Sequence, residues 1–431
     1  MNRIKEIIFA DTYHFKGSID ERFIDVAEQF SRLQAARSDV GGAALTVYFQ
    51  GKKVVDIYTG KKSATEDWAA DTLSVCYSTG KGVLATLAHI LVSAGQLEYD
   101  VPIAHYWPEF AQNGKEKMTL RDVLCHRSGL FDLRNLIDDA SEMLHWQHML
   151  KVMEQATPRF TVGQDTAYQA LTFGWLVGGI LEKATQQPLG WLMQSYLIQP
   201  LELDGAYFGL PQTELARVAL PIPRLKTATS HEGDAATKTG PSTKKMNASK
   251  KRGRHFSISE KVIEWSGQDP NDFKDAMIPK GMKNFSFFSP EGLHAVIPAA
   301  NGVFSASSLA KIYAMLANRG VWNDRVLIQP DVFHSLSRIQ SFSRDRVMPI
   351  PMNWRLGYHR VITMGKRVKK GFGHIGYNGS GAWCDPERGL SFAYTHNFAI
   401  GSITGDYRLW GLSQETIRCA DAILKGKKGW F

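Results

Sequence analysis

The stretch VCYSTGKGVLATLAHILVSAG, residues 75–95, is small and apolar and predicts a helix that enters the core of the protein. Ser78 and Lys81 stand three positions apart in it. Residues at this spacing are neighbours on a helix surface, so the hydroxyl and the amine can touch. Either Ser78 caps the helix and the spacing is accidental, or Lys81 accepts the proton of the Ser78 hydroxyl.

The segments on the two sides of this helix differ in kind. Upstream, residues 42–50 and 54–60 are rich in β-branched and aromatic residues and predict a hairpin. Downstream, apolar periodicity predicts helices until about residue 194, and strand character returns only near the end of the chain. The expected helices are 78–94, 119–130, 141–155, 171–186 and 413–426, and the expected late strands are 357–363, 374–386 and 389–397, with a hairpin from Asp385 to Gly389.

This order of elements predicts an α+β fold, in which helices are segregated from an antiparallel sheet. We expect one sheet built from both termini and flanked by helices, with a mainly helical domain inserted. The predicted sheet domain comprises residues 1–75 and 295–431, and the predicted helical domain comprises residues 76–294. Ser78 falls where the chain passes from one domain to the other, next to the cleft that such a division creates.

Composition and charge narrow the class of protein. The 431-residue chain has a formal net charge of +9, and residues 226–255 carry much of the excess. This basic insertion has almost no large apolar residues, so we expect it to be disordered, and a solvated loop is favoured over an arm for nucleic acid. The chain shows no signal peptide and no long apolar run, which predicts a cytoplasmic protein without a membrane span. Its four cysteines lack C-x-x-C spacing, which favours free thiols.

The chemistry of the Ser78 pair depends on its surroundings. A serine hydroxyl is a poor nucleophile until a base removes its proton, and a lysine can be that base only if its pKa is lowered. The apolar neighbours of Lys81 meet that condition. We also expect the backbone N–H of Ser78, in the first turn of the helix, to be available to an oxyanion. The S-x-x-K spacing alone does not discriminate, because it recurs at Ser242 and Ser308.

Several other stretches set the Ser78 pair apart from these two recurrences. They are YSTGKG (77–82), HRSGL (126–130), YQALTFGW (168–175), PAANGVFSA (298–306) and GHIGYNGSG (373–381). Together and in this order they resemble the serine β-lactamase-related hydrolases, and among these the class C-like branch called family VIII carboxylesterases. The resemblance runs from about residue 17 to the end of the chain, apart from the basic insertion.

The resemblance implies roles for a tyrosine and a histidine. Tyr168 matches the tyrosine that works with the lysine on the serine proton, but Ala170 replaces the asparagine of the Tyr-x-Asn motif of class C β-lactamases. That asparagine holds the amide arm of β-lactams, so its absence argues against an antibiotic substrate. His374, in His-Ile-Gly, matches the Lys-Thr-Gly motif of β-lactamases, whereas the literal Lys-Thr-Gly at residues 238–240 lies in the basic insertion and is set aside.

The same resemblance implies how a substrate is held. The backbone N–H groups of Ser78 and Tyr377 are expected to bind the oxyanion, and Gly376 and Trp383 are expected to contact the substrate. His374 is mostly neutral near pH 7 and can donate one hydrogen bond, but it binds a carboxylate poorly. This favours neutral esters over penicillins and acylated D-amino acids.

The sequence therefore predicts a serine hydrolase that cleaves small-molecule carboxylic esters through an acyl-enzyme on Ser78, without a metal or cofactor. Lys81, Tyr168 and His374 are its other predicted catalytic residues. A weak β-lactamase, a D-aminopeptidase-like peptidase and a transacylase are alternatives that use the same site. A catalytically retired scaffold that binds a partner through the basic insertion is the alternative from a different class. The sequence makes no prediction of the oligomeric state.

Overall fold

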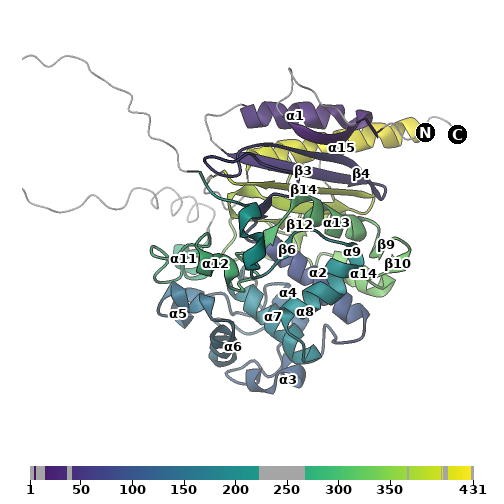
Figure 1. Cartoon of the computed structure of the whole chain (residues 1–431). Coiled ribbons are helices and arrows are strands. Elements are labelled where there is room, and N and C mark those ends of the chain that lie inside the picture. Colours follow the sequence, from purple (N-terminus) through teal and green to yellow (C-terminus); the bar gives the residue numbers. More distant parts are fainter. Residues whose placement is uncertain are drawn as a thin grey trace, which may run out of the picture.

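The computed structural model describes residues 4–5, 15–35, 41–222, 267–365, 368–398, 400 and 406–428. Its centre is an eight-stranded antiparallel sheet of order β1-β2-β4-β3-β14-β13-β12-β11 (Figure 1). The strands are β1 (Ile4–Lys5), β2 (Lys16–Asp20), β3 (Gly42–Phe49), β4 (Lys52–Gly60), β11 (His359–Arg360), β12 (Phe372–Ile375), β13 (Gly381–Asp385) and β14 (Leu390–His396). Because β3 pairs with β14, the two ends of the chain meet in the middle of the sheet, and the predicted α+β fold is confirmed.

Helices cover both faces of this sheet. One face carries α1 (Ile24–Ala35) and α15 (Tyr407–Lys428), and the other carries α13 (Ala306–Ala317) (Figure 1). Successive residues of a strand point to opposite faces, so the sheet contributes to two separate apolar cores. On β13, Trp383 belongs to the core shared with α1 and α15, whereas Ala382 belongs to the core that contains α13.

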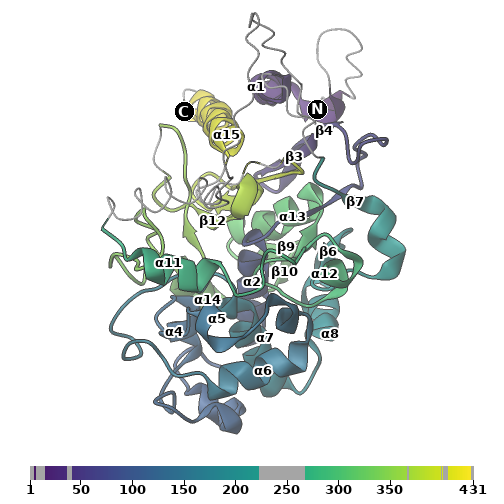
Figure 2. The same ribbon diagram turned by 90° about the vertical axis from the view of Figure 1, so that its left-hand side faces the viewer.

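The helix predicted from the residue 75–95 stretch is α2 (Thr79–Ser93), and it is buried along almost its whole length. It lies between the sheet and α7 (Thr172–Thr185), another long helix that is largely buried (Figure 2). Gly82 permits the close packing of α2, because a Cβ at this position would lie 2.2 Å from the Tyr313 hydroxyl. A helix buried on all sides needs no polar face, which explains the uniformly apolar sequence.

Shorter helices surround α2 and α7 on the side of the sheet away from α1 and α15 (Figure 1, Figure 2). They are α3 (Ile103–Tyr106), α4 (Leu120–Leu124), α5 (Leu133–Leu136), α6 (Trp146–Gln155), α8 (Leu189–Met193), α9 (Gln199–Leu201), α11 (Pro270–Met277), α12 (Pro290–His294) and α14 (Pro330–Ser337). A second sheet of order β6-β8-β5-β7 comprises β6 (Ala206–Tyr207), β8 (Val303–Phe304), β5 (Leu73–Val75) and β7 (Val218–Ala219), and a small hairpin comprises β9 (Val321–Trp322) and β10 (Arg325–Val326). The division into a sheet domain and a helical domain stays a prediction.

Two expected elements differ from the structure at their turns, and a third is confirmed. The helix expected at 119–130 ends at Leu124, because His126 takes a left-handed backbone conformation with φ of 58°. The strand expected at 374–386 is two strands, β12 and β13, separated by a turn in which Asn378 has φ of 73°. The hairpin that ends at Gly389 is confirmed, and Gly389 has the positive φ that such a turn requires.

Two expectations remain, one about the basic insertion and one about membrane-spanning helices. The basic insertion, residues 226–255, lies outside the described residues. Within the described parts of the chain, none of the helices combines the length and the apolar character needed to cross a membrane.

Candidate active site

Ser78 and Lys81 meet in the first turn of α2. Lys81 Nζ lies 3.0 Å from Ser78 Oγ, and it donates hydrogen bonds to the carbonyl oxygens of Ala170 at 2.6 Å and of Ala299 at 2.9 Å. The Lys81 side chain is fully buried, and none of the described carboxylates pairs with it. Burial without a counter-ion lowers the pKa of Lys81 well below its ordinary value.

Tyr168 joins this pair from the segment that precedes α7. Its side chain lines the same pocket as Ser78, and Lys81 Nζ lies 5.0 Å from the centre of its ring. Burial raises the pKa of Tyr168 above its ordinary value, so the phenol is protonated near pH 7. The structure therefore brings together the three side chains that the sequence analysis placed at the centre of the site.

Two residues that the sequence analysis missed hold Tyr168 in place. The Trp354 ring stacks on the Tyr168 ring, with 5.5 Å between centroids and 8° between planes. The buried Asp345 carboxylate accepts hydrogen bonds from the Tyr168 backbone N–H at 3.1 Å and from Trp354 Nε1 at 2.8 Å. It also accepts the backbone N–H groups of Val347 and Met348. Burial raises the pKa of Asp345 to about 6 in spite of these donors.

His126 supports the same segment from the other side. Its ring lies 5.0 Å from the Tyr168 ring, its Nδ1 accepts the Gln169 backbone N–H at 3.2 Å, and its carbonyl accepts the Ala167 N–H at 2.9 Å. The HRSGL stretch thus fixes the backbone on both sides of Tyr168, and its left-handed residue His126 makes both contacts.

His374 lies on β12 and contributes to the wall of the site. Its Nδ1 is 3.1 Å from the carbonyl oxygen of Ile375, and its ring centre is 4.8 Å from that of His359. Burial, together with His359 and Lys81, lowers the pKa of His374 well below its ordinary value, so the ring is neutral near pH 7. A carbonyl oxygen only accepts hydrogen bonds, so Nδ1 carries the proton of the neutral ring and Nε2 is an acceptor.

The neighbouring His359 also has its Nδ1 next to a backbone carbonyl oxygen, but both of its ring nitrogens have hydrogen-bond partners. Its Nδ1 lies 2.7 Å from the carbonyl oxygen of Arg360, and its Nε2 accepts the Ile375 backbone N–H at 3.0 Å. The one donated hydrogen bond that the sequence analysis allowed His374 is spent on its own strand. His374 is left with an unpaired acceptor, Nε2, and no further donor.

The turn after β12 brings the Tyr377 backbone next to the strand that leads to Ser78. A Cβ on Gly376 would lie 2.2 Å from the Cys76 carbonyl oxygen, so only glycine allows this approach. On the facing segment, Tyr77 takes a left-handed conformation with φ of 46° immediately before Ser78. The Tyr77 and Tyr377 rings meet edge to face, with 5.6 Å between centroids. The segments that carry the two predicted oxyanion donors are therefore adjacent.

Trp383 does not reach the substrate pocket, and the prediction that it contacts the substrate is wrong. In the register of β12 and β13, Trp383 is opposite Gly373 and Ala382 is opposite His374. Directly paired residues share a face of the sheet, so Trp383 and His374 point to opposite faces. Trp383 packs on Phe392 and donates from Nε1 to Ser413 Oγ of α15 at 2.9 Å.

A pocket opens at these side chains. Its lining comprises Ser78, Tyr168, Met277, Met348, Ile350, Met352, His359, Ile362, His374, Ile375 and Tyr377. The apolar part of the lining, the methionine wall, comprises Met277, Met348, Met352, Ile350 and Ile362, and no aspartate, glutamate, lysine or arginine is among the lining residues. The pocket thus offers an uncharged and mostly apolar surface next to the Ser78 hydroxyl.

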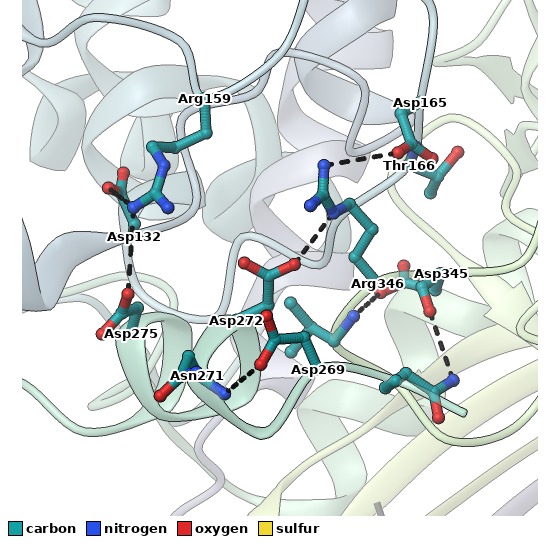
Figure 3. Close-up of polar contacts among 12 residues, drawn as sticks. Asp132, Arg159, Asp165, Thr166, Asp269, Asn271, Asp272, Asp275, Asp345 and Arg346 are labelled. Atoms are coloured by element: carbon teal, nitrogen blue, oxygen red, sulfur yellow. Dashed lines mark hydrogen bonds and ion pairs between the residues drawn. The ribbon is translucent and has the colours of Figure 1, made fainter. Parts of the chain in front are cut away.

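Ion pairs hold the methionine wall to the helical part of the molecule (Figure 3). Arg346, next to the segment that carries Met348, pairs with Asp272 of α11 at 2.8 Å and with Asp165 at 3.5 Å. Arg159 pairs with Asp132 at 2.9 Å and lies 3.8 Å from Asp275 of α11. Met277 is the last residue of α11, and Met348 lies in the segment next to Arg346. These ion pairs therefore fix both of these segments of the methionine wall relative to Tyr168.

Residues 27–408 match the family model described as Beta-lactamase. The chain belongs to this beta-lactamase family, and its fold is the α+β fold of β-lactamases and penicillin-binding proteins.

Particular relatives narrow the comparison. The chain is 33% identical over 388 residues to Esterase/beta-lactamase LipL from Mycobacterium tuberculosis, which covers 88% of this chain and 82% of that protein. Among solved structures it is similar to a family VIII carboxylesterase, with a TM-score of 0.78, 25% identity, and coverage of 94% of this chain and 100% of that chain. A penicillin-binding protein homologue from Caulobacter crescentus has a TM-score of 0.74, 28% identity, and coverage of 94% and 99%. The chain is thus a serine hydrolase of the beta-lactamase family.

Proposed function

We propose that the protein hydrolyses carboxylic esters through an acyl-enzyme on Ser78. The observation that carries this proposal is the set of contacts around Lys81 Nζ. A neutral amine has two N–H groups and one lone pair, and the carbonyl oxygens of Ala170 and Ala299 take the two N–H groups. The lone pair then faces Ser78 Oγ at 3.0 Å, where it can accept the hydroxyl proton.

Acylation follows from this geometry. Ser78 Oγ attacks the carbonyl carbon of the ester, and its proton passes to Lys81 Nζ, directly or through the Tyr168 hydroxyl. The oxyanion of the tetrahedral intermediate is bound by the backbone N–H groups of Ser78 and Tyr377. The bond from carbon to the alcohol oxygen then breaks, and the alcohol leaves with the proton returned through Tyr168.

Deacylation uses the same groups in the second half of the reaction. A water molecule attacks the acyl carbon and gives one proton to Lys81, and the oxyanion forms again between the two backbone N–H groups. The bond from carbon to Ser78 Oγ breaks, the proton returns to Ser78, and the carboxylic acid is released. His374 stays neutral throughout and belongs to the substrate-binding wall, where its role differs from that of a cationic lysine.

Two features favour neutral esters over β-lactams as substrates. Ala170 has no side-chain amide to bind the acylamino arm of a β-lactam. The pocket lining has no cation to bind a carboxylate, since burial keeps His374 neutral. LipL is named as both an esterase and a β-lactamase, so β-lactam hydrolysis is the alternative to test against ester hydrolysis.

Replacement of the nucleophile tests the proposal. Ser78→Ala should lower kcat for a short 4-nitrophenyl ester by at least about 10⁴-fold, because loss of a nucleophilic serine removes the acyl-enzyme route. Ser308→Ala is the matched control, since Ser308 and Lys311 repeat the S-x-x-K spacing but Ser308 donates to the Asp204 carbonyl oxygen. Turnover that persists in Ser78→Ala would overturn the assignment. Nitrocefin and D-alanyl amides, assayed in parallel, would rank the β-lactam and peptide alternatives.

A further inference from the structure

His374 presents a buried hydrogen-bond acceptor that has no partner within the described part of the chain. Its side chain is 2% exposed and lines the pocket, and Nε2 is the unpaired nitrogen. The ring is held by the hydrogen bond from Nδ1 to the Ile375 carbonyl oxygen. A buried acceptor without a donor costs free energy, which a ligand that supplies the donor can recover.

The neighbouring polar groups of the pocket do not supply this donor. The Tyr168 ring centre lies 6.3 Å from that of His374, and its hydroxyl makes no hydrogen bond to His374 Nε2. The Nδ1–H of His359 is directed to the Arg360 carbonyl oxygen, and its Nε2 is itself an acceptor. A donor for His374 Nε2 therefore has to come from a molecule in the pocket.

The remainder of the pocket sets the other requirements for that molecule. Met277, Met348 and Met352 form much of the wall, together with Ile350 and Ile362. Methionine side chains are flexible and polarizable, so such a wall tolerates apolar groups of different shape. A charged group would lose its hydration without gaining a counter-ion among the lining residues. The fitting ligand is uncharged and apolar, and it carries one hydrogen-bond donor.

We propose that the protein selects neutral hydroxy esters, whose O–H donates to His374 Nε2 while their apolar part lies on the methionine wall. This specificity rests on the ester hydrolysis proposed above. The hydroxyl can belong to the acyl chain or to the alcohol, because both are close to the ester carbonyl. A site built around such an acceptor discriminates strongly against an analogue whose donor is blocked, since the acceptor then stays unpaired.

Matched substrate pairs test the proposal from both sides of the ester. On the acyl side, phenyl 3-hydroxybutanoate is compared with phenyl 3-methoxybutanoate. On the alcohol side, 2-hydroxyethyl butanoate is compared with 2-methoxyethyl butanoate. The wild-type protein should prefer the hydroxy member of one pair by about tenfold in kcat/KM, the effect of one hydrogen bond to a neutral group. The pair that shows the preference identifies the side that carries the donor.

Two substitutions separate the acceptor from the ring that bears it. In His374→Gln, the longer amide places an acceptor near the position of Nε2, so the preference for the hydroxy ester should persist. In His374→Asn, the shorter amide can keep the hydrogen bond to the Ile375 carbonyl oxygen but has no atom at the position of Nε2, so the ratio should fall to about one. The ratio is measured within each variant, so a variant that is less active or less stable remains informative.

Several results would overturn the proposal. A wild-type ratio near one for both pairs would mean that the hydroxyl of the ester does not donate to Nε2. A preference for the hydroxy ester that persists in His374→Asn would mean that a residue other than His374 causes the selectivity. Failure of the proposed function is a separate result, because the wild-type protein would then turn over none of the four esters. In that case calorimetry measures the affinities of the four amides in which an N-methyl group replaces the ester oxygen. The ratio of affinities within each pair then replaces the ratio of kcat/KM and requires no turnover.

Discussion

Replacement of Gly376 by alanine should disable the site while leaving the fold in place. The added Cβ would lie 2.2 Å from the Cys76 carbonyl oxygen and 3.2 Å from Thr79 Oγ1. Cβ atoms essentially never come closer than 3.0 Å to another heavy atom, so the two backbone segments have to separate by about 0.8 Å. The atom in the way belongs to the backbone of the segment that leads to Ser78, and no side chain can rotate to relieve the contact.

The size of the effect follows from what these segments carry. Tyr377 and Ser78 provide the two proposed oxyanion donors, one on each side of the contact with Gly376. Loss of one oxyanion donor lowers kcat by about 10²–10³-fold, and misplacement of a reacting group by 1 Å can cost about 10²-fold. We therefore expect kcat/KM for a 4-nitrophenyl ester to fall by about 10²–10³-fold in Gly376→Ala.

The assay compares this variant with Gly190→Ala, because a Cβ on Gly190 of α8 has no heavy atom within 4 Å. Circular dichroism and thermal unfolding identify a temperature at which both variants are folded, and turnover is measured there. Gly190→Ala should keep wild-type activity. If folded Gly376→Ala keeps kcat/KM within about threefold of the wild type, the two segments do not form the proposed oxyanion site.

Two further predictions concern the groups around Tyr168. The kcat/KM should fall at low pH as Lys81 becomes protonated. Because burial lowers the pKa of Lys81, kcat/KM should reach its plateau well below the pH at which an ordinary lysine titrates. A pH–rate profile that rises steadily to about pH 10 would contradict this prediction. Asp345→Asn directs an amide N–H₂ at either Trp354 Nε1 or the backbone donors, so we expect a loss of about 1–3 kcal/mol in the free energy of unfolding, measured with urea, and a lower kcat. The same change at the exposed Asp138 should have neither effect, and equal losses at the two positions would refute the supporting role of Asp345.

The sequence predicts the parts of this molecule that rest on local patterns. The apolar stretch that became α2, the strands at both ends of the chain and the proximity of Ser78 to Lys81 all follow from residues close in sequence. Tyr168 is distant in sequence, and only the resemblance to a known family placed it beside Ser78. The alternation of β13 could be recognised, but which face Trp383 occupies depends on its register with β12, and a shift of one residue reverses every side chain.

The support of the site could not be predicted, because it depends on contacts without a local signal. Asp345 and Trp354 lie in a segment without helical or strand periodicity, yet they fix the Tyr168 backbone and ring. The acceptor character of His374 Nε2 is set by a single carbonyl oxygen, that of Ile375. Such features arise when the folded chain satisfies its buried polar groups, and no spacing of residue types encodes them.

The pairing of β3 with β14 has a consequence for how the protein is made. The Gly42 backbone N–H donates to the side chain of Asn397, which lies 355 positions later in the chain. The middle of the sheet therefore stays incomplete during most of synthesis. Until β14 leaves the ribosome, β3 has an unpaired edge, and the apolar helix α2 is not yet fully buried. Closing such a long loop is slow, and the nascent chain is exposed to aggregation in the interval. Molecular chaperones that bind extended apolar segments should therefore raise the yield of active protein more than they raise its stability once folded.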